Sequence, residues 1–419
     1  MRILLPSSGG REVALAQQFV NSGHVVYTDS KANPGLIEVG ARVLTDLDRD
    51  KPESILYAAE DYGMDLTVIG GESMLERGVV NLFEERRIPI VGPTANAARL
   101  ETDKWDCCQV LTRARVRIPH TVHCMNIREV EAELAGRDEA VIKPLRGTLG
   151  KGVFVMESPD FRGDAIKHVG QYPGRYLVQE RIRGRELSFF VAVNRMQAVF
   201  LGSAADYKLL GHSMTGGMGG YSPHELLTPA LYGQTMDRTV HPVLSQMDRE
   251  GRPFRGIAYF QLMITAEGEI YVIEINVRFG DPEAQLLMPL YRGDLAHLLA
   301  TTCKGQSLDE VGFKVRSDLC TVGYVLAADG YPGSKVRKDD VIQGLPEAAQ
   351  IADVIQAGTK RVGDEIRTDG GRVLTVVGQG SSYDEAMAQA CKARDLISFT
   401  GQRYRSDIAR HLSAKQRTA

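Results

Sequence analysis

The segment at residues 270–285, with the sequence IYVIEINVRFGDPEAQ, constrains the fold more than any other part of the chain. It opens with apolar, mostly β-branched or aromatic residues, which predict a β-strand. Because successive side chains on a strand point to opposite faces, Glu274, Asn276 and Arg278 should share one face. The two oxygen-bearing side chains suit Mg²⁺, which takes few protein ligands, and the guanidinium suits a phosphate or a carboxylate. A solvated strand end followed by a polar turn is the plainer alternative.

A second strand upstream predicts a hairpin. Residues 257–264 are largely apolar, and a turn at residues 266–269 contains Glu-Gly, so we expect the two strands to pair. In that pairing Gln261 lies opposite Glu274. A two-metal site would prefer a carboxylate at the partner position, so we expect a site with less negative charge.

The overall composition excludes several classes of protein. The chain has 419 residues, which is too many for one compact core and predicts two to four domains. A net charge of −3 gives no sign of a nucleic-acid partner, and no apolar run is long enough to cross a membrane. The N-terminal sequence lacks the apolar core of a signal peptide. The six cysteines show no CxxC spacing, so we expect reduced thiols in a cytoplasmic protein.

Residues 1–100 alternate between strand and helix patterns, which predicts a parallel sheet with helices on its faces. The first strand-to-helix loop contains Gly9 and Gly10, followed by Arg11 and Glu12. Small residues at a helix start let backbone N–H groups approach an anion, although a plain tight turn is the alternative. The loop is not GxGxxG, so NAD binding is disfavoured even though Asp29 ends the second strand. The expected elements are strands at 2–5, 25–27, 66–69 and 88–91, with a helix at 11–21.

The middle of the chain carries two lysines and a glycine-rich loop. One long helix is expected at residues 95–113, with Lys104 near its start, and a strand at 140–144 carries Lys143. The loop at 145–152 has three glycines and two cations, a composition suited to covering phosphates. It lacks the spacing of a Walker loop and joins strand to strand, so a flexible hairpin tip is the alternative.

A second glycine-dense segment, residues 214–223, follows the paired strands expected at 188–193 and 198–203. We expect this segment to be mobile and to contact a ligand closely, with an irregular surface loop as the alternative. From about residue 320 the pattern predicts a small α+β domain. Its expected elements are strands at 320–327, 351–357 and 372–377 and a helix at 383–397.

These motifs occur in the order of the ATP-grasp superfamily, and the chain resembles the phosphoribosylamine–glycine ligase (GAR synthetase) family over nearly its whole length. The motifs that carry this resemblance are Gly9-Gly10-Arg11-Glu12, Gly92-Pro93-Thr94, Gly150-Lys151-Gly152-Val153, Thr215-Gly216-Gly217-Met218-Gly219, Tyr221-Ser222-Pro223, Asn276-x-Arg278-Phe279-Gly280-Asp281-Pro282-Glu283, Gly330-Tyr331-Pro332-Gly333, Ala357-Gly358-Thr359 and Gly370-Gly371-Arg372-Val373-Leu374.

The resemblance implies an α/β protein with the ATP-grasp fold. An N-terminal parallel α/β domain would span residues 1–100, and a C-terminal α+β domain would span 319–419. The ATP-grasp domain would span 101–318 and include a small mobile lid at about 118–188.

The resemblance also implies roles for individual residues. Lys104 and Lys143 would hold the phosphates of ATP, and Glu274 and Asn276 would hold Mg²⁺ (or Mn²⁺). The other nucleotide-binding residues would be Gly147, Gly150 and Lys151 over the phosphates, Gln179, Glu180 and Ile182 at adenine, the last two through their backbone, and Glu186 at the ribose. Substrate-binding residues would be Gly9, Gly10, Arg11, Glu12, Asp206, Lys208, Thr215, Gly216, Gly217, Met218, Gly219, Arg278, Asp281 and Glu283. Catalytic residues would be Lys143, Arg278, Asp281 and Glu283.

The implied chemistry is amide formation through an acyl phosphate. A carboxylate attacks the γ-phosphate of ATP, and an amine then displaces the phosphate. In this family glycine and 5-phosphoribosylamine give glycinamide ribonucleotide, a step of purine biosynthesis. The implied partners are small molecules, with no nucleic acid or membrane, in a monomer or homodimer.

The sequence departs from the family pattern on the acceptor side. Ser7-Ser8 replace Gly-Asn in the first glycine loop, Val13 replaces a histidine, and Gly71 replaces the proline of Gly-Pro-Glu. The stretch at 205–209 and Met214 also differ, and the acidic loop between them is short. A paralogue that joins a different acid and amine therefore stays open.

Two further classes are open but disfavoured. A non-catalytic nucleotide-binding regulator would be expected to lose Glu274, Asn276 or Lys143, and all three are present. A carboxylating ATP-grasp enzyme that uses bicarbonate is disfavoured by the final domain.

Overall fold

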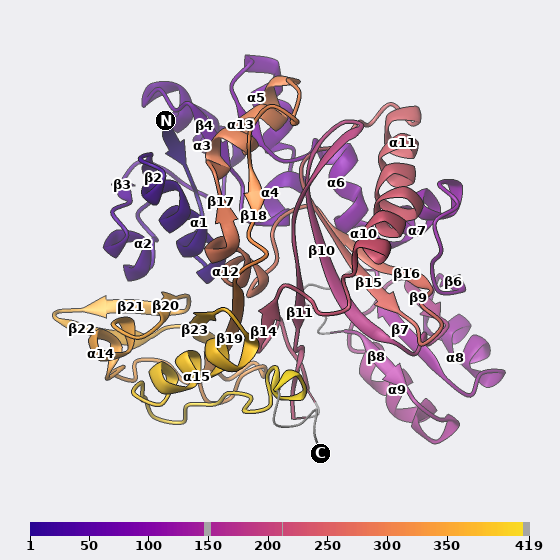
Figure 1. Ribbon diagram of the computed structural model, residues 1–419. Helices are drawn as coiled ribbons and strands as arrows, with labels where there is room; N and C mark the ends of the chain where they lie inside the picture. Colours follow the sequence, from indigo (N-terminus) through magenta and orange to yellow (C-terminus); the bar gives the residue numbers. More distant parts are fainter. Residues whose placement is uncertain (146–151, 212, 414–419) are drawn as a thin grey trace.

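The computed structural model describes residues 1–145, 152–211 and 213–413. Its N-terminal part is built on five parallel strands in the order β3-β2-β1-β4-β5, which confirms the predicted parallel sheet. The sheet and its helices form the indigo and purple region at the upper left of Figure 1. The strands are β1 (Arg2–Leu4), β2 (Val25–Asp29), β3 (Arg42–Leu44), β4 (Leu66–Val68) and β5 (Ile90–Val91), and the helices are α1 (Gly10–Asn21), α2 (Pro34–Glu38), α3 (Pro52–Asp61), α4 (Glu72–Glu76) and α5 (Val79–Arg86).

Both faces of this sheet are covered. Ile3 packs in an apolar cluster that contains Phe19 of α1, while its neighbour Leu4 packs in another cluster that contains Phe83 of α5. All four side chains are fully buried. Strands buried on both faces explain why their sequences are continuously apolar rather than alternating.

The long helix predicted at residues 95–113 is two helices, α6 (Ala95–Thr102) and α7 (Lys104–Arg113). Asp103 interrupts them because its side chain accepts hydrogen bonds from the backbone N–H groups of Trp105 at 3.1 Å and Asp106 at 3.0 Å. Such an N-cap starts a new helix at the following residue. Lys104 therefore stands at the first position of α7 rather than within one continuous helix.

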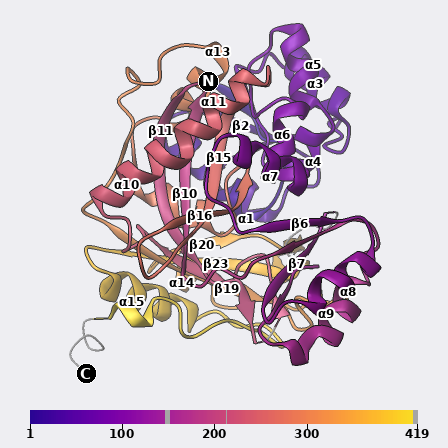
Figure 2. The same cartoon turned by 90° about the vertical axis from the view of Figure 1, so that its right-hand side faces the viewer.

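The predicted lid contains a separate sheet of four strands in the order β6-β9-β7-β8. Two helices cover it, and the lid lies at the lower right of Figure 2. Val130, Ile142 and Val178 are fully buried in its own small core. The elements are β6 (Thr121–Cys124), α8 (Ile127–Ala135), β7 (Ala140–Pro144), β8 (Phe154–Met156), η1 (Pro159–Phe161), α9 (Arg162–Val169) and β9 (Tyr176–Gln179). Gly147, Gly150 and Lys151 lie outside the described residues.

An antiparallel sheet of eight strands joins the rest of the chain, in the order β16-β15-β10-β11-β14-β19-β23-β20. The predicted C-terminal strands β19, β23 and β20 therefore continue the sheet of the preceding strands instead of forming a sheet of their own. The strands are β10 (Arg185–Asn194), β11 (Gln197–Asp206), β14 (Gly219–Ser222), β15 (Arg255–Ile264), β16 (Ile270–Asn276), β19 (Cys320–Ala327), β20 (Asp353–Gln356) and β23 (Arg372–Gly380).

The remaining elements are helices and short strands, and these strands form three separate two-stranded pairs. The predicted helix at 383–397 is α15, which packs on β19 and β23 and ends at Arg394. The helical elements are α10 (Pro229–Thr235), η2 (Met236–Val240), α11 (His241–Arg249), α12 (Glu283–Leu287), η3 (Met288–Leu290), α13 (Leu295–Lys304), α14 (Leu345–Ala349), α15 (Tyr383–Arg394) and η4 (Arg410–Leu412). The short strands are β12 (Leu209–Leu210), β13 (Ser213–Met214), β17 (Tyr291–Arg292), β18 (Lys314–Val315), β21 (Thr359–Val362) and β22 (Glu365–Thr368).

The predicted hairpin is formed by β15 and β16, and Gln261 pairs with Glu274 as expected. The register shifts by one residue directly after Gln261, which opposes Leu262 to Val272. This irregularity lies on the turn side, so the pairs Gln261–Glu274 and Tyr259–Asn276 keep the predicted register. The carboxylate and the amide therefore project from neighbouring positions on one side of the strand.

The glycine-dense segment differs from the expected mobile loop, because residues 219–222 form β14, a buried strand between β11 and β19. A Cβ atom on Gly220 would lie 1.9 Å from the carbonyl oxygen of Ala205, and one on Gly219 would lie 2.3 Å from that of Gly323. These two glycines are needed for the close approach of neighbouring strands, so the surface-loop alternative is wrong for this part of the segment.

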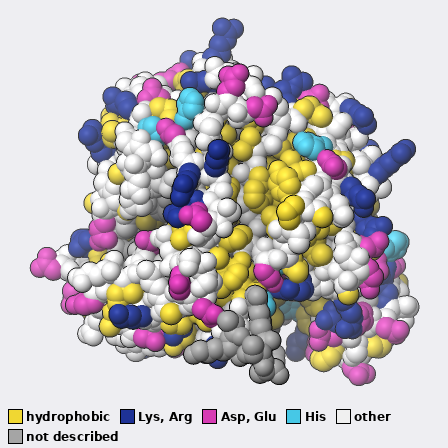
Figure 3. Space-filling view, in the orientation of Figure 1, with side chains coloured by type: hydrophobic (Ala, Val, Ile, Leu, Met, Phe, Trp, Pro, Cys, Tyr) yellow, Lys and Arg dark blue, Asp and Glu magenta, His cyan; other side chains and the backbone are white. Residues whose placement is uncertain are grey.

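No helix within the described ranges combines the length and hydropathy needed to span a bilayer. On the face shown in Figure 3, basic and acidic side chains are interspersed over the surface. All six cysteines are free thiols.

We expect Gly220→Ala to lower the free energy of unfolding by more than about 2 kcal/mol, because the new methyl group meets backbone that cannot move aside. Gly233→Ala in α10 is the matched control, since a Cβ atom there meets nothing within 4 Å. Alanine in a helix should be neutral or stabilising by up to about 1 kcal/mol. Urea denaturation of both variants measures the difference, and equal stabilities would contradict the packing role of Gly220.

Candidate active site

The candidate site is organised by positive charge around Glu274 at the end of β16. Burial alone would raise the pKa of this half-buried carboxyl, but the ammonium groups of Lys208, Lys143 and Lys104 outweigh burial and hold its pKa at about 2. The three lysines come from the segment after β11, from β7 of the lid and from the start of α7. The fold thus brings together residues far apart in the sequence, and the result is a carboxylate that stays ionised.

Lys143 connects the lid to the central sheet. Its side chain is 7% exposed, and Nζ donates a hydrogen bond to the carbonyl oxygen of Ile273 at 3.3 Å. Burial lowers the pKa of Lys143, while Glu274 opposes that shift. A buried ammonium beside a carboxylate is ready to meet an additional anion such as a phosphate.

Glu186, on β10, faces the same cluster. Its Oε2 lies 3.6 Å from Lys208 Nζ and accepts a hydrogen bond from Gln261 Nε2 at 2.8 Å. The other end of the Gln261 amide accepts hydrogen bonds from Ser188 and Tyr259. Both ends of Gln261 are thus engaged, and a neutral side chain fills the position where a two-metal site would place a carboxylate.

A divalent cation fits the oxygen donors at this strand end. Asn276 Nδ2 lies 3.5 Å from Glu274 Oε1, so the two side chains sit next to each other. Among the residues that the structure describes, no group of three or more His, Cys, Asp or Glu side chains is arranged to hold a metal ion. Two protein ligands with the remainder from phosphate and water match the preference of Mg²⁺.

The residues predicted to hold adenine lie where the lid meets the central sheet, at the end of β9 and just after it. Gln179 is buried and donates from Nε2 to Thr121 Oγ1 at 2.8 Å. The backbone N–H of Glu180 donates to the carbonyl oxygen of His120 at 2.9 Å. Only the carbonyl of Glu180 can therefore serve a nucleotide. Ile182 follows on the connection to β10 and is half-buried.

The start of α1 is occupied by a side chain of the protein. Glu12 is 1% exposed, and its Oε2 accepts the backbone N–H of Gly9 at 2.8 Å. Its Oε1 accepts from Arg11 Nε at 2.8 Å, and Arg11 Nη1 donates to the carbonyl oxygen of Phe279 at 3.0 Å. The Gly9 N–H is therefore already engaged within the chain. Gly10 and the Arg11 guanidinium remain as candidate donors.

Two acidic side chains, Asp206 and Glu283, lie near one another between the central sheet and α12. Burial and the neighbouring Glu283 raise the pKa of Asp206 well above its usual range, and Lys208 only partly opposes this. Oδ1 of Asp206 has no hydrogen-bond partner within the described part of the chain. A buried acid with an unused oxygen suits a substrate that brings N–H or O–H donors.

Asp281 is held by an arginine that the sequence analysis did not assign to the site. Arg372 of β23 lies 3.1 Å from Asp281 Oδ2 through Nη2 and donates from Nη1 to the carbonyl oxygen of Gly216 at 2.8 Å. Although burial raises the pKa of Asp281, Arg372 and Arg11 lower it below its usual value. The Gly-Gly-Arg motif at residues 370–372 is the sequence feature that could have marked Arg372 as a site residue.

The segment 215–219 divides into two parts. Thr215 Oγ1 donates to the carbonyl oxygen of Lys208 at 2.7 Å and accepts from the N–H of Gly217 at 3.1 Å, which orders the loop at the site. The N–H of Gly216 donates to the Tyr331 hydroxyl at 3.1 Å. Met218 is fully buried and belongs to a small core cluster.

Met218 thus packs in the core, and its backbone N–H and carbonyl bond to Tyr207 and Val325. The same holds for Gly219 in β14, whose carbonyl accepts from the Tyr207 N–H.

Arg278 lies beyond the end of β16, where two carboxylates hold it. Nη2 lies 2.8 Å from Glu101 Oε1, and Nε lies 3.5 Å from Glu72 Oε2. Burial opposes the charge of the guanidinium, but these two acids raise its pKa further above the usual range. Sequence reasoning assigned neither acid to the site, since Glu72 was noted only as the end of the altered Gly-Pro-Glu motif and nothing local marks Glu101.

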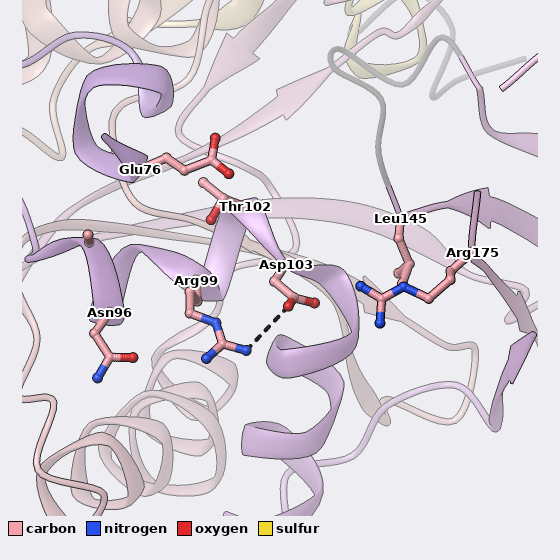
Figure 4. A pocket seen from close by; sticks show the side chains of 8 residues that line it. Glu76, Asn96, Arg99, Thr102, Asp103, Leu145 and Arg175 are labelled. Carbon is pink, nitrogen blue, oxygen red and sulfur yellow. Dashed lines mark hydrogen bonds and ion pairs between the residues drawn. The ribbon is translucent and has the colours of Figure 1, made fainter. Parts of the chain in front are cut away.

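A pocket of about 440 Å³ opens between the N-terminal part and the lid (Figure 4). Arg99 pairs with Asp103 on one side, and Arg175 of the lid points into the hollow from the other. The pocket lies beside the α6–α7 junction, but Lys104, Lys143, Lys208 and Glu274 are not among its lining residues. Its lining residues are Glu76, Ala95, Asn96, Arg99, Thr102, Asp103, Leu145 and Arg175.

Three family models match the chain in succession. They are described as the N domain, the ATP-grasp (A) domain and the C domain of phosphoribosylglycinamide synthetase, at residues 1–101, 102–284 and 321–411. A phosphoribosylamine–glycine ligase of Vibrio parahaemolyticus is 34% identical over 432 residues, which cover 99% of each chain.

Solved structures agree with this assignment. The crystal structure of a phosphoribosylamine–glycine ligase from Thermotoga maritima superimposes with a TM-score of 0.83 at 28% identity, covering 98% of this chain and 100% of that one. A biotin carboxylase of Campylobacter jejuni superimposes with a TM-score of 0.74 at 16% identity, covering 96% and 92% of the two chains. The second likeness shows the fold alone.

His224 contacts the backbone of Glu186, and its protonation makes the stability of the fold depend on pH. The side chain is 2% exposed; Nε2 lies 2.9 Å from the Glu186 carbonyl oxygen, and Nδ1 accepts from the Leu226 N–H at 3.1 Å. The bonds to Glu186 and Leu226 suit the neutral ring, although Nδ1 also lies 3.1 Å from Glu225 Oε2. Burial accordingly lowers the pKa of His224 to about 4 from its ordinary 6.5.

Because the unfolded chain binds this proton more readily, stability is lost as the pH falls from 6.5 towards 4. We expect the wild type to lose roughly 1 to 2 kcal/mol between pH 7 and pH 5 from this group, and His224→Gln to lose correspondingly less. Urea denaturation at both pH values measures this, with His241→Gln as the control that keeps the wild-type dependence. Identical pH dependence of the wild type and His224→Gln would contradict the assignment.

Proposed function

The chain belongs to the phosphoribosylglycinamide synthetase family, and we propose that it is an ATP-dependent ligase that joins glycine to 5-phosphoribosylamine. The products would be glycinamide ribonucleotide, ADP and phosphate. The observation that carries this proposal is the convergence of Lys104, Lys143 and Lys208 on Glu274, beside Arg278, in a chain whose full length matches the family. This arrangement favours phosphoryl transfer to a carboxylate.

The nucleotide would lie between the lid and the central sheet. Lys104 and Lys143 would neutralise phosphate oxygens, and Glu186 would accept hydrogen bonds from the ribose hydroxyls. Gln179, Glu180 and Ile182 would contact adenine. Glu274 and Asn276 would hold Mg²⁺ (or Mn²⁺), which neutralises charge on the phosphates when it is bound.

In the first step a carboxylate oxygen of glycine attacks the γ-phosphorus. The bond between that phosphorus and the bridging oxygen of ADP breaks, and the bridging oxygen keeps the electron pair. The product is a mixed anhydride of glycine and phosphate. Arg278 would stabilise the charge on the transferred group, so catalysis is mainly positioning and electrostatic stabilisation.

In the second step the amine of phosphoribosylamine attacks the carbonyl carbon of the anhydride. The bond from that carbon to the phosphate oxygen breaks, and phosphate leaves with the electron pair. The amine loses a proton, which the departing phosphate can accept, and Asp206 would contact the amine through its Oδ1, which has no hydrogen-bond partner among the described residues. Asp281, held by Arg372, would orient the acceptor from the other side.

A second candidate is a paralogue with another acceptor, and one observation favours it. Ser8 stands where the family has asparagine, and its hydroxyl accepts from Arg49 Nη1 at 2.6 Å. Arg49 is also paired with Asp29 at 2.5 Å. The loop at Ser8, which would contact the sugar of the acceptor, is therefore bonded to Arg49 and, through it, to Asp29. These contacts could change which sugar hydroxyl groups the loop recognises.

We expect Glu274→Gln to lower turnover by roughly 10²-fold or more, a loss of about 3 kcal/mol of transition-state stabilisation, because the amide keeps the shape but removes the charge. Folding should change little. Release of ADP measures turnover, and the rise in melting temperature with MgATP measures binding. A variant with wild-type turnover would place the metal elsewhere.

The substrate test supplies glycine, MgATP and freshly generated phosphoribosylamine and looks for glycinamide ribonucleotide by mass spectrometry. Turnover within the usual range of about 1 to 10³ s⁻¹ supports the proposal. Phosphate release that requires another acid or amine would instead favour the paralogue.

Arg11→Ala should raise the KM for the phosphorylated partner and leave that for ATP nearly unchanged. Arg86→Ala, at an exposed position of α5, is the control.

A further inference from the structure

We propose that Glu101 is a positioning residue for phosphoryl transfer, which holds the Arg278 guanidinium in the orientation that meets the transferred phosphate. The proposal rests on the proposed function, because it takes Arg278 as the group that contacts the phosphoryl oxygens. Glu101 itself contacts no substrate in this account. It acts through Arg278 and through the backbone next to it.

Both carboxylate oxygens of Glu101 are used on the same short segment. Oε1 lies 2.8 Å from Arg278 Nη2, and Oε2 accepts the backbone N–H of Val277 at 2.7 Å. The Glu101 side chain is 10% exposed and that of Arg278 is 14% exposed. One carboxylate on α6 therefore fixes both the path of the chain leaving β16 and the side chain that follows.

The remaining contacts of Arg278 leave room for a ligand. Nη1 donates to the carbonyl oxygen of Phe279 at 3.2 Å, and Nε lies 3.5 Å from Glu72 Oε2. A guanidinium has five N–H donors, so these contacts leave donors for phosphoryl oxygens. The longer distance to Glu72 makes Glu101 the stronger of the two restraints.

The same contacts join the acceptor side to the phosphoryl side. The Phe279 carbonyl that accepts from Arg278 also accepts from Arg11 Nη1 at 3.0 Å. Arg11 lies in the first turn of α1, and Glu101 lies in the last turn of α6. The N-terminal part thus sets the position of Arg278, and a misplacement of about 1 Å at such a group can cost roughly 10²-fold in rate.

The test compares Glu101→Ala and Glu101→Gln with the wild type. We expect kcat to fall about 10²-fold for the alanine variant and about 10-fold for glutamine, which keeps the shape but not the charge. The KM for ATP should stay within about threefold, because the proposed contact of Arg278 strengthens only as charge develops on the phosphoryl group in the transition state. Glu84→Gln, which breaks a surface pair with Arg255 at 3.2 Å, is the matched control and should behave as wild type.

A second readout does not depend on the acceptor. Affinity for MgADP with aluminium fluoride, which mimics the phosphoryl group in transfer, should fall in Glu101→Ala by about the same factor as kcat. Affinity for MgADP alone should be unchanged. A merely structural role would weaken both ligands together, and that result would overturn the proposal.

Wild-type kcat in Glu101→Ala, with Arg278→Ala inactive, would also overturn it. If the alanine variant does not fold, the isosteric glutamine variant decides by the same two readouts. If the wild type makes no product from glycine and phosphoribosylamine, the proposed function fails, and the aluminium fluoride comparison still judges Glu101.

Discussion

Three ammonium groups face one carboxylate at the end of β16, and the rest of the site depends on this charge balance. Lys208, Lys143 and Lys104 offset the cost of burying Glu274 and keep its pKa low. Lys208 is itself balanced by Glu186, which lies 3.6 Å away, and by the nearby Asp206 and Glu283. The phosphates of a nucleotide would be further anionic partners for the same ammonium groups.

The charged residues of the site come from different parts of the fold. The lid contributes Lys143, the α6–α7 junction contributes Lys104, and the central sheet contributes Glu274. The C-terminal strands extend the central sheet, so Arg372 of β23 reaches Asp281 and the backbone of the 215–217 loop. Side chains on strands of one continuous sheet keep fixed relative positions, which suits a reaction that depends on placement.

Local sequence patterns predicted the strands and the hairpin that position the site. Contacts between residues far apart in the sequence leave no local pattern and could not be predicted. The hairpin register followed from turn and strand signals, so the pairing of Gln261 with Glu274 was accessible from sequence. The break at Asp103 was hidden, because a capping aspartate resembles any other polar residue within a helical pattern. The hold of Glu101 on Val277 spans 176 positions along the chain, and no local signal marks such a pair.

The central claim is that a carboxylate becomes an acyl phosphate before the amide bond forms. Glycine labelled with ¹⁸O in its carboxyl group tests it directly, because the attacking oxygen stays with phosphorus when the amine displaces phosphate. The account predicts one ¹⁸O atom in each inorganic phosphate released with the amide product, seen by mass spectrometry or by the isotope shift in ³¹P resonance. Phosphate that carries no label, formed together with the product, would contradict it.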